Sequence, residues 1–285
     1  MIAIISSTFK EVIRKKTFIV MGIITILFII FWAVILNYFQ DAHLSEKNVT
    51  FNSLASIVLT QTVLQFSSML MCLITIVLGA GAIASELENG MIHAILSRPL
   101  DRMEYIFGKL FGLSILIAAY ATALFTTILL IGRIYSLDTI TMLTFDQVFE
   151  GWIFYTLVPL ILLSLTICGS IRLKMISNGL LMIFIYILGN IGGMVEMIGN
   201  YLNNKAMDSS GIFLSLISPF HTLYTTAEGI LLPSSGLTGE VMRVTGGLTG
   251  RGQPASSVMF IYIIIYTLGF IALAISKFRK IDINS

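Results

Sequence analysis

The charged residues that could carry chemistry gather in one short segment, from Ser85 to Gly112. This segment reads SELENGMIHAILSRPLDRMEYIFGKLFG and separates two long apolar stretches. Its seven charged residues are Glu86, Glu88, Arg98, Asp101, Arg102, Glu104 and Lys109. Such a segment can pass the movement of a bound partner to the adjoining helices. Without a partner it is only a polar connector. Its internal pattern favours the first interpretation.

A short helix is predicted inside this segment. Gly90 precedes an apolar face, and Pro99 ends it because the residue before a proline, here Arg98, disfavours the helical conformation. Asp101 and Glu104 have the spacing of a capping box, which predicts that the next membrane helix starts there. The residues of the apolar face, at helical spacing, are Met91, Ile92, Ile95 and Leu96. Residues 85–109 therefore predict a loop with an amphipathic helix held at both ends by membrane helices.

The composition identifies the flanking stretches as membrane helices. Hydrophobic residues make up 56% of the 285-residue chain and charged residues 11%, against about 25% charged in a soluble protein. A bilayer-spanning helix needs about 20 apolar residues. Six charge-free windows meet that length: Thr17–Gln40, Asn48–Ser85, Leu110–Gly132, Gly151–Ile171, Met175–Val195 and Gly252–Ser276. We therefore expect an all-α membrane protein with six transmembrane helices.

The basic residues orient this predicted bundle. Cytoplasmic segments are enriched in Lys and Arg, so we expect both termini to be cytoplasmic and the protein to lie in the plasma membrane. With this orientation, 12 of the 17 Lys and Arg residues are on the inner side: Lys10, Arg14, Lys15, Lys16, Arg98, Arg102, Lys109, Arg172, Lys174, Lys277, Arg279 and Lys280.

One further charge-free stretch, from Ser209 to Ala227, could be taken for a seventh span. It contains Pro219, and a seventh crossing would place the basic cluster near Lys277 outside. We expect instead two short re-entrant pieces, Ile212–Ser218 and Thr222–Leu232. Protein must cover such irregular backbone at membrane depth. Both pieces belong to a predicted extracellular loop of residues 196–257.

The first 16 residues have a helical period of their own. The pattern is typical of a helix lying in the membrane interface, on the cytoplasmic side here. The alternative is a frayed terminus whose periodicity is accidental. The predicted apolar face consists of Ile2, Ile5, Phe9, Val12 and Ile13.

Two patterns within the spans concern packing or transport. The second span carries a polar stripe, which either lines a route between two copies of the chain or forms hydrogen bonds between helices of one copy. The stripe consists of Gln61, Gln65, Ser68, Cys72 and Thr75. Gly108 with Gly112, and Gly189 with Gly193, have the spacing of close helix contacts. Packing within one subunit is the simpler interpretation, and a dimer face is the alternative.

Several classes of function are disfavoured. A net charge of +2 without a basic tract argues against nucleic acid binding. The three His and two Cys residues form no motif for metal binding, and no Walker motif is present. No span has a central Asp, Glu, Lys or Arg, which disfavours a carrier driven by protons or sodium. We expect no catalytic residue, and no metal or cofactor bound by this chain.

The charged segment resembles the E-x-E-x-G…L-x-R-P-x-x-R…G-K signature of ABC-2 type permeases, the membrane subunits of type V ATP-driven exporters. It is most similar to those described as multi-copper enzyme maturation permeases. The family's Thr after Gly90 is replaced by Met91 here. The matching residues are Glu86, Glu88, Gly90, Leu96, Ser97, Arg98, Pro99, Arg102, Gly108 and Lys109.

This resemblance implies that the short helix from Gly90 to Ser97 is a coupling helix docking on an ATPase subunit. Glu86 and Glu88 would then hold the loop against neighbouring helix ends. It also implies a single permease domain over residues 1–285, pairing with a second permease copy or a paralogue in the lipid membrane. ATP and Mg²⁺ would bind to the partner ATPase. The alternative function is an ATP-independent channel or carrier, or a membrane-anchored assembly factor.

Overall fold

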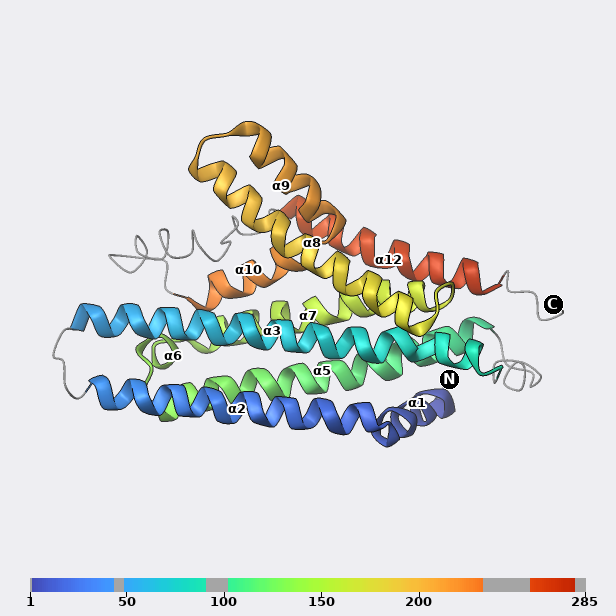
Figure 1. Cartoon of the computed structure of the whole chain (residues 1–285), viewed down its shortest axis with the longest axis horizontal. Coiled ribbons are helices and arrows are strands. Elements are labelled where there is room, and N and C mark those ends of the chain that lie inside the picture. Colours follow the sequence, from blue (N-terminus) through green and yellow to red (C-terminus); the bar gives the residue numbers. More distant parts are fainter. Residues whose placement is uncertain (1, 44–48, 91–101, 233–256, 280–285) are drawn as a thin grey trace.

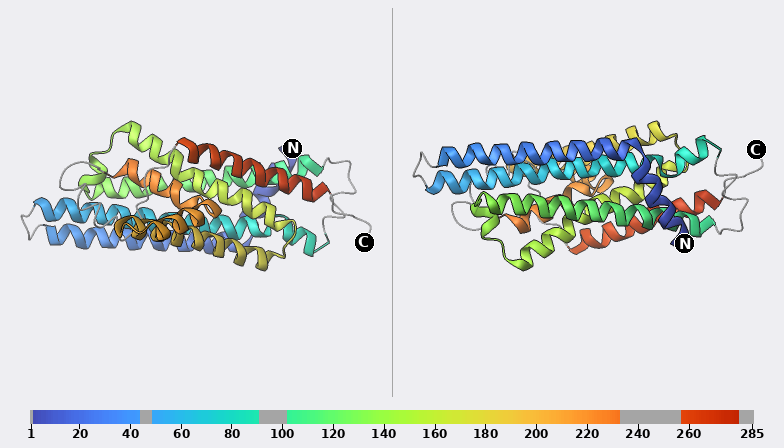
Figure 2. Two further views of the ribbon diagram at one scale, coloured as in Figure 1. Left: turned by 90° about the horizontal axis from the view of Figure 1, so that it is seen from above. Right: turned by 90° about the horizontal axis from the view of Figure 1, so that it is seen from below.

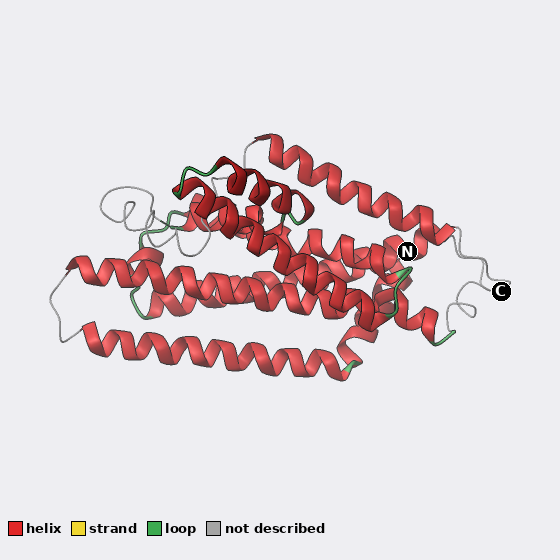
Figure 3. Ribbon diagram, turned by 45° about the horizontal axis from the view of Figure 1, so that its top comes forward, coloured by secondary structure: helices red, strands yellow, loops and turns green. Residues whose placement is uncertain are grey.

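The computed structural model describes residues 2–43, 49–90, 102–232 and 257–279 of the chain (Figure 1). The described residues are helices joined by short loops, without a strand (Figure 3). The helices are α1 (Ile2–Arg14), α2 (Lys16–His43), α3 (Val49–Glu88), α5 (Arg102–Ile134), α6 (Asp138–Thr141), α7 (Phe145–Ser170), α8 (Met175–Tyr201), α9 (Lys205–Ile217), α10 (Phe220–Leu231) and α12 (Ser257–Arg279). The all-α prediction is confirmed.

Six of the described helices, α2, α3, α5, α7, α8 and α12, are long and apolar enough to cross a membrane. This confirms the six predicted spans, although each of the six helices extends past its charge-free window at one end or both. The described part of α5 begins at Arg102, and α8 continues to Tyr201. With 40 residues, α3 is about 60 Å long, twice the roughly 30 Å of a hydrocarbon core.

The bundle has a centre and a rim. In the most apolar window of each helix, 72% of α3 and 67% of α7 is buried, but only 11% of α2 and of α12. The outward faces of α2 and α12 carry large apolar side chains such as Phe31 and Ile265. These faces suit contact with lipid tails, because hydrocarbon imposes no cost on exposed apolar side chains.

One end of the bundle, which we call the terminal end, holds the start of α1 and the end of α12 (Figure 1). The end of α3, the start of α5 and the turn between α7 and α8 lie at the same end. Figure 2 shows α1 crossing the ends of the longer helices at an angle. The N-terminal residues therefore form a helix separate from the first long helix.

The face that α1 buries differs from the predicted apolar face. Ile4, Thr8 and Val12 are buried, whereas Ile13 is 52% exposed. The cause lies in α5, where Gly108 faces Ile4 and Gly112 faces Thr8 at short range. Because the Thr8 hydroxyl donates to the Ile4 carbonyl oxygen at 2.8 Å, its burial leaves no unmet hydrogen bond.

After α8 the chain turns back on itself. Antiparallel to α8, α9 runs back toward the terminal end, and α10 then runs away from it beside α7 (Figure 1). The break between α9 and α10 is at Ser218 and Pro219. The two predicted pieces are thus helices, but α9 starts at Lys205, seven residues before Ile212. Asn204 caps that start by accepting a hydrogen bond from the Ala206 amide at 3.1 Å.

The glycines of α8 allow the chain after α8 to pack closely against this helix. A Cβ added at Gly189 would meet Ser218, and one added at Gly193 would meet the His221 ring. Gly192 similarly faces Leu214 of α9. The small-residue pattern of this span is therefore used for packing inside the subunit, as its simpler interpretation predicts.

The contact between α1 and α5 can be tested with Gly108→Ala. The added Cβ would lie 2.7 Å from Cγ2 and 2.8 Å from Cβ of Ile4, which forces the two helices apart. We expect a loss of about 1–3 kcal/mol of stability, measured as a lower Tm of the purified protein in detergent. The matched control is Gly22→Ala in α2, where nothing lies within 4 Å. Equal Tm values for the two variants would contradict the packing described.

Candidate functional site

A buried ion pair joins α3 to α5 at the terminal end. Lys109 Nζ lies 2.6 Å from Glu86 Oε1, and the side chains are only 5% and 7% exposed. The Tyr105 hydroxyl donates a hydrogen bond to Glu86 Oε2. Tyr105 and Lys109 are four residues apart on one face of α5, so both reach the same carboxylate. This arrangement holds the last turn of α3 against the second turn of α5.

The same ammonium group also binds α1. Lys109 Nζ donates to Glu11 Oε2 at 2.6 Å, and the other oxygen of Glu11 lies 2.8 Å from Lys15 Nζ. Burial raises the pKa of the Glu11 carboxyl, but the hydrogen bonds and charges of Lys109 and then of Lys15 lower it by more. The pKa therefore lies below its ordinary value of 4.5. Lys109 thus ties α1, α3 and α5 together.

A fourth helix, α8, is attached through Glu88. Its Oε1 accepts a hydrogen bond from the backbone amide of Met175, the first residue of α8, at 2.6 Å. A helix N-terminus has free amide groups and a partial positive charge, so a carboxylate there stabilises the helix. Nearby, the Met175 side chain covers Gly81 of α3. The end of α3 therefore contacts both the start of α5 and the start of α8.

The two acidic residues singled out by the sequence, Glu86 and Glu88, thus contact neighbouring helix ends in the structure. Gly90 is exposed, with a φ of +67° and nothing within 4 Å of an added Cβ. Arg102 is the first residue described in α5. The remaining predicted residues of the short helix, Met91, Ile92, Ile95, Leu96, Arg98 and Pro99, lie outside the described residues.

Two members of the cluster were not found by sequence reasoning. They are Glu11 and Tyr105. One signal was available for each. Glu11 is the only acidic residue before the first span, and Tyr105 precedes Lys109 by one helical turn.

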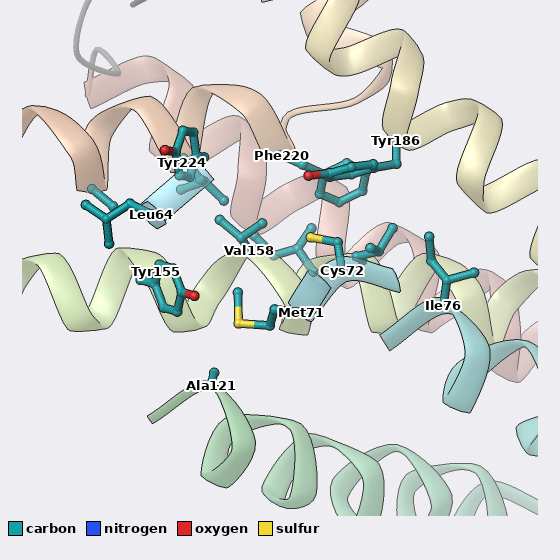
Figure 4. Packing of buried hydrophobic residues seen from close by; sticks show 14 of the residues in the cluster. Leu64, Met71, Cys72, Ile76, Ala121, Tyr155, Val158, Tyr186, Phe220 and Tyr224 are labelled. Carbon is teal, nitrogen blue, oxygen red and sulfur yellow. The ribbon is translucent and has the colours of Figure 1, made fainter. Parts of the chain in front are cut away.

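The polar stripe of α3 lies inside the chain. Gln61, Ser68, Cys72 and Thr75 are buried, and Gln65 is partly buried. Figure 4 shows Cys72 among Tyr186 of α8, Phe220 of α10 and Val158 of α7. Ser68 and Cys72 both lie close to the Tyr186 side chain. In this structure the stripe therefore makes contacts between helices of one copy.

Within the residues that the structure describes, no group of three or more His, Cys, Asp or Glu side chains could hold a metal ion. The ionisable cluster at the terminal end consists of two carboxylates, two ammonium groups and one phenol. Such a set binds through charge and hydrogen bonds. Its geometry suits a structural connection between the ends of α1, α3 and α5, which we call the joint.

Removing the shared ammonium group tests this joint. Lys109→Met leaves Glu86 buried without a counter-charge, so we expect a loss of about 3–5 kcal/mol of stability. The double change Lys109→Met with Glu86→Gln should recover most of it, because no buried charge then remains on either partner. Stability is measured by denaturant unfolding in detergent.

The matched control for this experiment is Lys15→Met, which removes the other cation from Glu11. Lys15 is 37% exposed, so the expected change is about 0–1 kcal/mol. If Lys15→Met and Lys109→Met cost the same, the buried pair does not hold the joint.

The lowered pKa of Glu11 predicts a dependence on pH. A carboxyl whose pKa is lower in the folded protein stabilises the fold above its unfolded value, and this contribution is lost as pH falls through the folded value. The Tm difference between wild type and Glu11→Gln should therefore be constant from about pH 8 to 6, shrink below about pH 5, and disappear once the pH lies below the lowered pKa of Glu11. Glu150→Gln, at an exposed position on α7, serves as the control. A difference that persists in acid would show that the charge of Glu11 is not what attaches α1.

The comparison with known families agrees with this architecture. A family model described as "ABC-2 family transporter protein" matches residues 2–283. A search of curated proteins found no matching relative. The family match covers nearly the whole chain, including all six long helices and the cluster at the terminal end. The resemblance carried by the charged segment is confirmed, and the chain belongs to the ABC-2 transporter family.

Proposed function

We propose that this chain is the permease subunit of an ATP-driven exporter, which pairs with a second permease copy and with separately encoded ATPase chains. Family membership identifies the chain as a membrane transport component. The sequence has no Walker motif, so in this proposal ATP and Mg²⁺ bind to the partner chains.

The observation that carries the proposal is the way both ends of residues 91–101 are held. Before this segment, Glu86 and Glu88 bind α5 and α8, and after it, Lys109 binds α3 and α1. A force applied to the segment therefore reaches four helices through contacts that are buried or close to a helix end. An ATPase that docks on residues 90–98 can move these helices as a unit.

The orientation completes the proposal. The terminal end faces the cytoplasm, where ATP is available, and α1 lies along the inner membrane surface. The helices α9 and α10, with 13 and 12 residues, are too short to span the bilayer and form a re-entrant unit on the outer side. The polar stripe of α3 lines the substrate route in a state in which α8 and α10 have moved away from α3.

Changes in the segment itself test the coupling. Gly90→Pro cannot adopt a φ of +67° because the proline ring holds φ near −65°. We expect Gly90→Pro, and Arg98→Glu combined with Arg102→Glu, to abolish co-purification of the ATPase and substrate-stimulated ATP hydrolysis. Membrane insertion and yield should remain those of the wild type.

The matched control is Gly90→Asn, because asparagine tolerates the left-handed conformation and nothing crowds this position. It should retain the ATPase and its stimulation. Purification of the wild type without any ATPase would instead favour the alternative of an ATP-independent channel, carrier or assembly factor. Retention of the ATPase by Gly90→Pro would contradict docking on this segment.

A further inference from the structure

A large groove lies between α8 and α12. Its volume is about 730 Å³, within the range of roughly 300–1,000 Å³ that is typical of small-molecule sites. The wall residues come from α7, α8, α9 and α12 and are mostly apolar. They include Leu165, Leu181, Ile185, Phe213 and Phe270.

Specific hydrogen bonds close this groove at the end of α9. Tyr262 and Tyr266 of α12 donate to the carbonyl oxygens of Leu216 and Ile217, at 2.5 and 3.0 Å. These carbonyls belong to the last turn of α9, where carbonyl oxygens have no amide donor within the helix. The tyrosines therefore fix α9 to α12 and set one limit of the groove.

The groove follows α12 from these tyrosines to the terminal end of the bundle. Tyr262 and Lys277 both line it and are 15 residues apart, a distance of about 22 Å along a helix. This is longer than half of a roughly 30 Å hydrocarbon core. The groove is thus long enough to hold an extended acyl chain from the membrane interior to the membrane surface.

Two cations stand at the terminal end of the groove. Arg172, in the turn after α7, and Lys277, near the end of α12, both line it. Both are close enough to Cys168 on α7 to act on its thiol electrostatically. Neither forms an ion pair with any carboxylate in the described ranges. An apolar trough therefore ends at two positive charges that have no described anionic partner.

We propose that this groove binds one anionic phospholipid from the membrane leaflet at the terminal end. One of its two acyl chains lies between α8 and α12, and its phosphate headgroup lies between Arg172 and Lys277. Lipid tails enter any lateral apolar groove, so the selection comes from the headgroup. Basic pockets between transmembrane helices bind anionic headgroups in this way. This proposal does not rest on the coupling function proposed above, because lipid binding can be measured without an ATPase.

The test measures lipid binding by native mass spectrometry of the delipidated protein in neutral detergent. Phosphatidylglycerol is compared with phosphatidylcholine carrying the same acyl chains. We expect wild type to prefer phosphatidylglycerol, and the double variant Arg172→Gln, Lys277→Gln to show a preference about 25-fold smaller, a factor of roughly five for each cation. Phosphatidylcholine binding should not change.

The matched control is Lys174→Gln, which removes one charge from the same turn at a residue that does not line this groove. It should leave the preference intact. An equal loss in this control, or a wild type without preference, would overturn the proposal. If the double variant fails to fold, Ile185→Trp replaces it, since it fills the groove without changing a charge and must lower binding of both lipids.

A second measurement locates the lipid. Cys168 lines the groove and is partly exposed, whereas Cys72 is buried in the core and serves as an internal reference. Phosphatidylglycerol should slow the reaction of Cys168 with a small membrane-permeant maleimide several-fold, and phosphatidylcholine should slow it less. Binding without protection of Cys168 would place the lipid elsewhere. Protection by a second copy of the chain, seen as a dimer without bound lipid, would also overturn the proposal.

Discussion

A charge that is placed at the edge of the hydrocarbon must be paired, and Lys109 shows how strongly this constraint shapes the bundle. Its ammonium group is almost fully buried, so both available carboxylates, Glu86 and Glu11, are drawn to it. Removing one partner of such a pair leaves an uncompensated charge, which costs far more than the pair itself contributes. The ends of α1, α3 and α5 are therefore held in one arrangement. The segment between α3 and α5 is thus attached at both ends to helices whose relative positions are fixed.

Away from these charges, the helices are held by close packing. Lipid tails are as apolar as leucine side chains, so helices in a membrane associate through small residues and satisfied polar groups. Gly108 and Gly112 allow α1 to pack closely against α5, and the glycines of α8 allow α9 and α10 to pack closely against α8. At the contact with α5, the buried Thr8 hydroxyl donates to a carbonyl oxygen of its own helix.

What the sequence predicts well is local. Hydropathy and charge locate six spans, and Pro219 marks the break between α9 and α10. The contacts of Glu86 and Glu88 with helix ends are implied by the family resemblance of their segment and not by their spacing. Pairings over long separations are not encoded locally: Glu11 meets Lys109 across 98 positions, and no period in either helix specifies the other. The face of α1 that packs against α5 is not encoded locally for the same reason, because glycines in α5 decide it. The spacing of the polar stripe shows that its residues share one side of α3. It does not show which helix, or which second copy of the chain, packs against that side.

The turn between α7 and α8 connects the two sites that we propose. Glu88 holds the first residue of α8, and Arg172, three residues before it, lines both the notch beside Glu88 and the groove along α12. A movement of the end of α3 would therefore shift the cation that we assign to the lipid headgroup. The coupling is reciprocal. If a bound lipid headgroup stabilises one position of this turn, then that position of the turn must increase the affinity for the lipid. An anionic lipid would then bias the same helices that the proposed ATPase moves.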